Sequence, residues 1–127
     1  MKEIIRFKEK LNFLHYYDPT FLQNYVFLIS PFSDNELKRV CNWVELDFIT
    51  KGNRRGTTLF SKDSQRVAVV IWEVNHSVIF HELIHAVMST FRKIGDSEIG
   101  FQNEESFAYY CQRLATVLYT YHPVLAV

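Results

Sequence analysis

Several residue types that shape small proteins are scarce in this chain of 127 residues, which has four glycines, three prolines and two cysteines. The two cysteines, Cys41 and Cys111, form no CxxC pair, so we expect free thiols rather than a disulfide framework. No uncharged apolar run approaches the roughly 20 residues that a membrane span needs. Charges interrupt the N-terminal stretch MKEIIRFKEKLNF, which is not typical of a signal peptide. We therefore predict a cytoplasmic protein that does not insert into membranes.

An excess of charge of either sign is also absent, because fourteen Lys and Arg residues balance fourteen Asp and Glu residues. No net field would draw the protein onto nucleic acid or an anionic membrane. The basic run KGNRRG, from Lys51 to Gly56, is interpreted as an exposed turn because it is short and has two glycines. The aromatic residues fall at core-like spacings and not between basic residues. We predict neither nucleic acid nor a membrane as a partner.

Hydrophobic residues are abundant by contrast, at 48% of the chain, and 16% of all residues are aromatic. Large aromatic side chains help a short chain to bury enough apolar area to fold. A chain of this length suits one domain and leaves little room for two. We predict a single domain over residues 1–127.

Periodicity and turn signals predict the elements of that domain. Residues 1–18 are ambiguous between a helix and a strand. Ser33 and Glu36 fit a capping box, and Asn75 and Asn103 can cap the last two helices. The expected order is a strand at 25–30, a helix at 34–45, a hairpin of 57–61 and 66–74, and helices at 75–93 and 103–121. This order predicts an α+β domain with a small antiparallel or mixed sheet and helices on one side.

The segment VIFHELIHAV carries the residues with the clearest chemical meaning, because His81, Glu82 and His85 form an H-E-x-x-H pattern. Residues four apart lie on one face of a helix, so two imidazole nitrogens can meet a zinc ion about 2 Å from each. Glu82 lies one step round the helix, where it can take a proton from a zinc-bound water. The pattern predicts a Zn²⁺ site with its own general base.

An alternative interpretation makes His81 and His85 core residues hydrogen-bonded to backbone, with Glu82 at the surface. Apolar residues surround the pair in the sequence, and two buried imidazoles would need polar partners. One metal ion would satisfy both rings, which favours the zinc site over this alternative.

A third protein ligand is needed if a fourth position is to stay open for water. The stretch NEESFAYYCQRL begins a helix that can fold back against the H-E-x-x-H helix. Glu105 shares a face with Ala108, Tyr109 and Gln112, whereas the face of Glu104 continues into core-like residues, so we prefer Glu105. Tyr109 could then stabilise an oxyanion. The other candidates are His15, His76, Asp96, Glu98, Glu104 and His122.

An H-E-x-x-H helix followed about twenty residues later by a helical Glu resembles the Glu-zincin metallopeptidases, of which thermolysin is the best-known member. IFHELIHAV and NEESFAYYCQRL are most similar to the small zincin-like proteins of tailed phages. The resemblance covers roughly residues 66–119 and implies a minimal zincin-like domain. It implies His81, His85 and Glu105 as zinc ligands and Glu82 as general base. It also implies that the strand RVAVVIWEV is a sheet edge that binds an extended peptide.

These features together predict a zinc-dependent metallopeptidase of the phage-encoded type, acting on a peptide or protein in the host cytoplasm or as part of the virion. The alternative is a catalytically weak or inactive zincin-fold protein, a metal-stabilised binding or phage accessory component. The short chain and the absence of a visible lid or specificity subdomain favour that alternative. A fourth coordination position closed by His15, His76 or His122 would also favour it.

Overall fold

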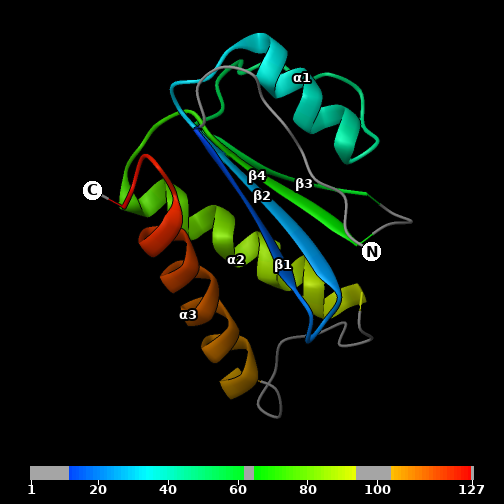
Figure 1. Cartoon of the computed structure of the whole chain (residues 1–127), viewed down its shortest axis with the longest axis vertical. Helices are drawn as coiled ribbons and strands as arrows, with labels where there is room; N and C mark the ends of the chain where they lie inside the picture. Colours follow the sequence, from blue (N-terminus) through cyan, green and yellow to red (C-terminus); the bar gives the residue numbers. More distant parts are fainter. Residues whose placement is uncertain (1–11, 62–64, 94–103, 127) are drawn as a thin grey trace.

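A four-stranded mixed sheet forms the centre of the protein (Figure 1). The structure is a computed structural model that describes residues 12–61, 65–93 and 104–126. The strands are β1 (Phe13–Asp18), β2 (Gln23–Ile29), β3 (Gly56–Phe60) and β4 (Arg66–Ile71), in the spatial order β1-β2-β4-β3. β1 pairs antiparallel with β2, β2 parallel with β4, and β3 antiparallel with β4. The predicted α+β class and mixed sheet are confirmed.

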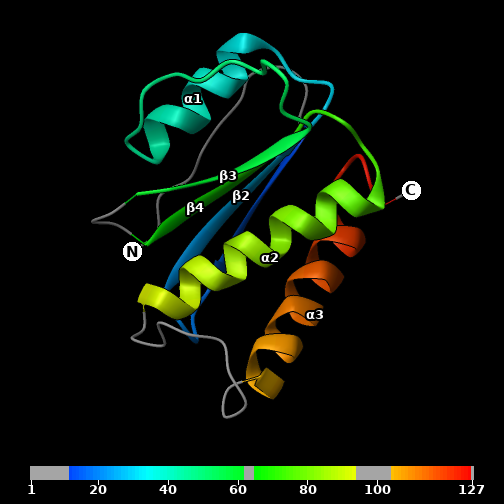
Figure 2. The ribbon, with the colours of Figure 1, turned by 180° about the vertical axis from the view of Figure 1, so that it is seen from behind.

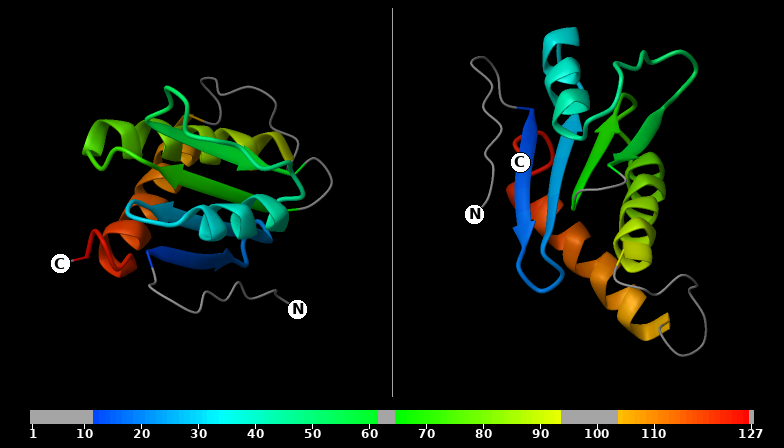
Figure 3. Two further views of the ribbon diagram at one scale, coloured as in Figure 1. Left: turned by 90° about the horizontal axis from the view of Figure 1, so that it is seen from above. Right: turned by 90° about the vertical axis from the view of Figure 1, so that its right-hand side faces the viewer.

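Three helices cover the sheet, and they lie on both of its faces. Helix α1 (Asp34–Trp43) packs on one face, while α2 (His76–Lys93) and α3 (Glu104–Tyr121) pack on the other, as Figure 2 shows from behind. The prediction that the helices lie on one side was therefore wrong. Figure 3 shows α1 and α2 on opposite sides of the strands.

The sequences of the two central strands explain this arrangement. Tyr25, Phe27 and Ile29 of β2 belong to the core under α2 and α3, whereas Val26 and Leu28 belong to the core under α1. Successive side chains of a strand point to opposite faces, so a strand that is apolar at every position needs cover on both. β4, with the sequence RVAVVI, follows the same rule.

Helix α1 begins at the predicted capping box and ends sooner than predicted. Ser33 Oγ accepts from the Glu36 N–H at 3.1 Å, and the Glu36 carboxylate accepts from the Ser33 N–H at 2.8 Å. Glu45 has a φ of 64°, and the Leu46 N–H donates to the Cys41 carbonyl at 2.9 Å. A left-handed residue and this hydrogen bond are typical of a Schellman motif, which ends the helix at Trp43 rather than at Glu45.

The other predicted elements agree with the structure within a few residues. Asn75 caps α2, because its Oδ1 accepts from the Val78 N–H at 3.0 Å. The hairpin forms as expected, although β4 ends at Ile71 instead of continuing to residue 74. The ambiguous segment becomes a strand at residues 13–18, while residues 1–11 and the predicted cap Asn103 lie outside the described part of the chain.

Cys41 is buried, Cys111 is partly buried, and both are free thiols as expected. Among the described residues, no helix combines the length and the apolar character needed to cross a bilayer.

Candidate active-site groove

His81 and His85 lie one turn apart on the solvent-facing side of α2, and their rings converge. The two Nε2 atoms are 3.3 Å apart, and the ring planes meet at 76°. Two nitrogens bound tetrahedrally to one zinc ion at about 2.0–2.1 Å would be separated by about 3.3 Å. Both rings are exposed, so the interpretation of them as buried core residues is wrong. The pair therefore fits two positions of a zinc site.

Glu82 occupies the opposite environment, because its side chain is buried between α2 and β3 and is only 6% exposed. The Thr58 hydroxyl lies 2.7 Å from Glu82 Oε1 and 3.0 Å from the Glu82 backbone carbonyl. A hydroxyl that donates to a carboxylate forms a charge-assisted hydrogen bond, which fixes the orientation of the acid. Glu82 is thus held beside the histidine pair by a residue of the neighbouring strand.

Gly56 lets β3 approach α2 at this point. A Cβ built at Gly56 would lie 3.0 Å from Glu82 Cγ, 3.0 Å from Val78 Cγ1 and 3.2 Å from Ile71 Cδ1. Nonbonded carbon atoms are at their optimal separation at about 3.5–4.0 Å, so a side chain here would push the strand away from the helix. The contact between Thr58 and Glu82 depends on this close approach.

The surface between β3 and α2 is hollowed on both sides of Glu82. One cleft of about 370 Å³ is lined by Arg55, Gly56, Ser77, Val78, His81 and Glu82. A second cleft of about 240 Å³ is lined by Gly56, Thr57, Thr58, Phe60, Glu82, His85 and Arg92. The two clefts share Gly56 and Glu82, and we call them together the β3–α2 groove. Each of the three motif residues lines it.

β3 is the edge strand beside this groove, and part of its backbone is unpaired. The Trp72 N–H donates to the Arg55 carbonyl at 3.0 Å, and the Ser61 N–H to the Arg66 carbonyl at 3.4 Å. Backbone groups of successive residues alternate in direction, so the odd-numbered residues of β3 pair with β4. The N–H and C=O groups that point to the free edge are those of Gly56, Thr58 and Phe60.

The expectation that the strand RVAVVIWEV is the peptide-binding edge was wrong. β4 lies between β2 and β3, so both of its edges already carry ladder hydrogen bonds. A strand paired on both sides has no backbone groups left for a peptide. β3, the first strand of the hairpin, takes that position.

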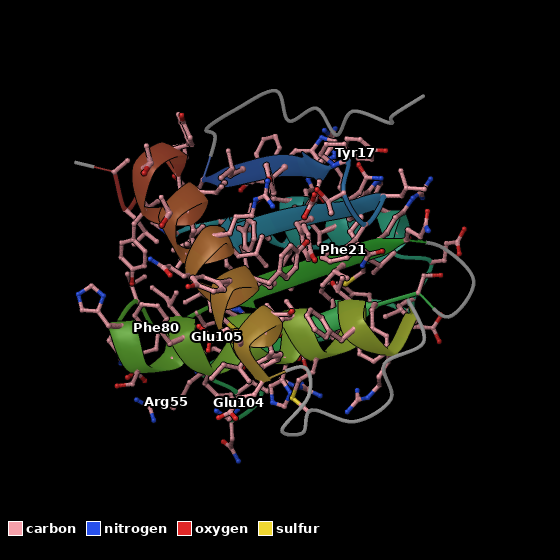
Figure 4. All side chains as sticks on the ribbon, turned by 90° about the horizontal axis from the view of Figure 1, so that it is seen from below. Tyr17, Phe21, Arg55, Phe80, Glu104 and Glu105 are labelled. Atoms are coloured by element: carbon pink, nitrogen blue, oxygen red, sulfur yellow. The ribbon has the colours of Figure 1, made fainter. Side chains whose placement is uncertain are left out.

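Glu105 and Glu104 are both exposed in the first turn of α3. Figure 4 labels both residues in a view of the molecule from below. In the part of the chain that the structure describes, however, no group of three His, Cys, Asp or Glu side chains could hold a metal ion. The structure therefore brings together His81, His85 and Glu82, but it does not bring Glu105 or Glu104 onto the histidine pair.

The two faces of α3 that carry Glu104 and Glu105 differ in exposure, as the sequence predicts. Phe107 and Cys111, on the face of Glu104, pack against the core. Ala108 and Gln112, on the face of Glu105, are exposed. Tyr109 is 63% exposed, and its role in oxyanion binding stays a prediction.

The three other candidate histidines have partners elsewhere. The ring of His15 bonds to Asn24 at 3.1 Å, and His76 Nδ1 lies 2.6 Å from the Tyr119 hydroxyl. His122 is fully buried. Asp96 and Glu98 lie outside the described residues. Within the described residues, none of the three histidines closes a fourth position next to His81 and His85.

Sequence reasoning missed several residues of the groove, among them Arg55, Gly56, Thr58 and Arg92. The prediction that residues 51–56 form an exposed basic turn is correct for residues 51–55, but Arg55 also lines the groove and pairs with Glu73 at 2.7 Å. A glycine at the start of a strand signals a close backbone approach, so Gly56 could have been found. Nothing in the sequence indicates that Thr58 contacts Glu82.

Comparisons of the chain with protein-family models, with curated proteins and with solved structures find no match.

Proposed function

We propose that the protein is a zinc-dependent metallopeptidase in which Glu82 acts as general base, as the resemblance to Glu-zincins implies. The observation that supports this most strongly is the convergence of His81 and His85 Nε2 atoms to 3.3 Å on the wall of a groove that also contains the Glu82 carboxylate. The proposed setting is the host cytoplasm if the protein is phage-encoded.

A zinc ion held by His81 and His85 would polarise the scissile carbonyl and lower the pKa of a bound water to about 7. Glu82 then accepts a proton from the attacking water and delivers it to the leaving nitrogen. Thr58 holds the Glu82 carboxylate in place by its hydrogen bond. The burial of Glu82 keeps bulk water from competing for that carboxylate.

The proposed substrate is an extended peptide, because the groove runs along a free strand edge. Three residues of β3 direct backbone groups to that edge, and an extended peptide can add to them as a further strand. The Thr58 side chain bonds to Glu82, and the side of the Gly56 backbone where a Cβ would stand also faces Glu82. A peptide paired with β3 would therefore pass next to the proposed catalytic residues.

Glu105 stays the proposed third ligand on the basis of the resemblance, and the metal content of purified variants tests it. We expect about one zinc per chain in the wild type, and loss of zinc in His81→Ala, His85→Ala and Glu105→Ala. Glu104→Ala is the matched control and should retain the metal. If Glu104→Ala loses zinc and Glu105→Ala keeps it, the assignment of the two acids is reversed.

Peptide hydrolysis by Glu82→Gln tests the general base separately from the metal. We expect zinc content to be unchanged and turnover to fall by about 10²–10⁴, the usual contribution of a general base. Turnover equal to that of the wild type would contradict the role of Glu82.

A second candidate function is a binding or phage accessory protein that uses the same groove without catalysis. It is favoured by the lack of a three-residue metal group among the described residues and by the exposure of Tyr109. This candidate predicts peptide binding with no hydrolysis at any zinc concentration, whereas the metallopeptidase predicts hydrolysis that a chelator abolishes.

A further inference from the structure

Arg92 lies on the same stripe of α2 as the two motif histidines. It follows His85 by seven residues, or two helical turns, and residues at this spacing share a face. It lines the second cleft of the groove together with His85, Thr58 and Phe60. The groove therefore has an exposed arginine in its lining beyond the histidine pair.

The charge of Arg92 is not neutralised by any described residue. The one ion pair in the described part of the chain joins Arg55 and Glu73, in which Arg55 Nε and Nη2 donate to the two carboxylate oxygens at 3.0 Å and 2.7 Å. Arg92 is exposed and makes no such pair there. Among the described residues, the two ends of the groove consequently differ, since Arg55 is paired with a carboxylate and Arg92 is not.

Among the described residues, one acidic side chain lines the second cleft, and its carboxylate is engaged elsewhere. That residue is Glu82, which is buried and accepts a hydrogen bond from Thr58. Within that described lining, no other carboxylate competes for the Arg92 guanidinium. Arg92 also stands in the last turn of α2, where a cation interacts favourably with the helix dipole, but this does not use its hydrogen-bond donors.

We propose that Arg92 forms a specificity subsite for an acidic side chain of a peptide bound along β3, so that the substrates of this protein are acidic on the His85 side of the scissile bond. The guanidinium binds the Asp or Glu carboxylate through paired N–H···O hydrogen bonds. The inference rests on the proposed function only in that it assumes a bond to be cleaved. The subsite itself requires only that a peptide binds in the groove.

The distance between His85 and Arg92 along the groove indicates where the acidic residue lies in the bound peptide. Seven residues of helix separate His85 from Arg92 by about 10 Å. An extended peptide covers about 3.3 Å per residue, so the acidic residue lies about three residues from the bond beside His85. The opposite side of the bond, next to Arg55 and its partner Glu73, carries no such preference.

Direct binding measurements test the subsite without relying on catalysis. Three labelled peptides, identical except for a block of three Glu, three Gln or three Lys residues, are titrated against the full-length Glu82→Gln protein at low salt. Each peptide is made with the block before or after the neutral centre, because the chain direction in the groove is not assumed. We expect one Glu peptide to bind about tenfold more tightly than its Gln counterpart, a preference that high salt weakens.

Variants of Arg92 assign that preference to one side chain. Arg92→Gln should abolish the preference for Glu, Arg92→Lys should retain most of it, and Arg92→Glu should transfer it to the Lys peptide. The matched control is Arg113→Gln, which removes an exposed arginine of α3 that does not line the groove and should leave the preference intact. Circular dichroism checks that each variant is folded.

The results separate this inference from the proposed function. Equal binding of Glu and Gln peptides, a preference that survives Arg92→Gln, or no binding of any peptide would overturn the subsite. Acidic binding that depends on Arg92, combined with a wild-type protein that holds no zinc and hydrolyses no peptide, would support the subsite and refute the metallopeptidase. Hydrolysis of peptides without any acidic preference would refute the subsite alone.

Discussion

Neighbouring residues of the H-E-x-x-H motif have different environments, although they occupy a single stretch of helix. His81 and His85 are exposed and close to each other, whereas the intervening Glu82 is buried against β3. The angle of about 100° between successive helical residues produces this separation. The histidines therefore face the solvent side of the groove, and Glu82 forms its floor beside Thr58.

Replacement of Thr58 by Val should destabilise the protein, because it leaves the buried Glu82 carboxylate without its hydrogen-bond donor. We expect the free energy of unfolding to fall by about 1–3 kcal/mol, measured by urea denaturation at neutral pH. Thr58→Ser should restore most of the loss. The same Val substitution should cost less in a Glu82→Ala background, and an equal cost in both backgrounds would show that the hydrogen bond contributes nothing.

His122 should make the stability of the protein depend on pH below neutrality. Burial of the ring lowers the pKa of His122 below 6.5 in the folded state. Its Nε2–H donates to the Phe27 carbonyl at 3.1 Å, and Nδ1 accepts from the Val124 N–H at 3.0 Å, so protonation of Nδ1 would break the second bond. The unfolded chain then binds the proton more readily than the folded one.

The lowered pKa of His122 makes the folded state less stable as the pH falls. The stabilisation is fully present above about pH 6.5, the ordinary pKa of histidine, and is lost as the pH falls toward the lower folded value. We expect the free energy of unfolding to decrease between about pH 7 and pH 5. His122→Gln should be less stable at neutral pH but less sensitive to this change. An identical pH dependence of the variant and the wild type would contradict the role of His122.

At the scale of elements, the relation between β3 and α2 creates the groove. An edge strand with an unpaired backbone edge lies against the helix that carries the motif, and Gly56 permits the contact. The adjacent hairpin strand β4 is buried between two neighbours and provides the support for β3. The groove is therefore a property of a strand and a helix together, and neither element has it alone.

Gly56→Ala should disturb this junction. The new methyl group would lie 3.0 Å from both Val78 Cγ1 and Glu82 Cγ, and overpacking of this kind costs about 1–3 kcal/mol. We expect a lower thermal midpoint and weaker peptide binding. A second substitution, Val78→Ala, removes one of the two contacts, so Gly56→Ala should cost less in that background. An equal or larger cost there would indicate that β3 does not approach α2 as closely as described.

At the scale of the whole molecule, a buried polar cluster joins the sheet to both helices of one face. The Tyr25 hydroxyl of β2 bonds to Thr90 of α2, and it lies 2.8 Å from the Tyr110 hydroxyl of α3. Gln23 Nε2 also donates to Thr90 Oγ1 at 3.2 Å. Polar groups buried in this way must be hydrogen-bonded, so the cluster specifies how α2 and α3 dock on the sheet.

Alkaline pH should destabilise the packing of α2 and α3 on β2. Burial raises the pKa of Tyr25 from 10.0 to about 12, and burial also raises the pKa of Tyr110. A raised tyrosine pKa means that the folded state keeps a proton that the unfolded chain loses, so stability is present below about pH 10 and falls between pH 10 and pH 12. For Tyr25 the loss amounts to about 3 kcal/mol.

Stability measured by urea denaturation at a series of alkaline pH values, with tyrosinate absorbance as the second probe, checks this prediction. The part of the absorbance change that comes from Tyr25 and Tyr110 should appear only as the protein unfolds, because both side chains are buried. Tyr25→Phe should be less stable than the wild type at neutral pH, through loss of two hydrogen bonds, and less sensitive to alkali. Ionisation of all tyrosines at pH 10 without loss of structure would contradict the predicted role of Tyr25 and Tyr110.

Local signals in the sequence determined the secondary structure and two of the proposed metal ligands. The Ser33–Glu36 capping box, the Asn75 cap and the apolar run of β2 act over a few residues, so they could be predicted without knowledge of the fold. The spacing of His81 and His85 likewise needs only a helix to bring their Nε2 atoms together.

Only the tertiary structure decided which strand is the edge, which face each helix covers and what holds Glu82. These depend on pairings between distant segments, such as β2 with β4, and on the 24-residue separation between Thr58 and Glu82. The same long-range packing places the basic end of the groove at Arg92 and compensates the other end with the Arg55–Glu73 pair. Local propensity cannot specify such contacts, because each is selected by the burial of the whole core at once.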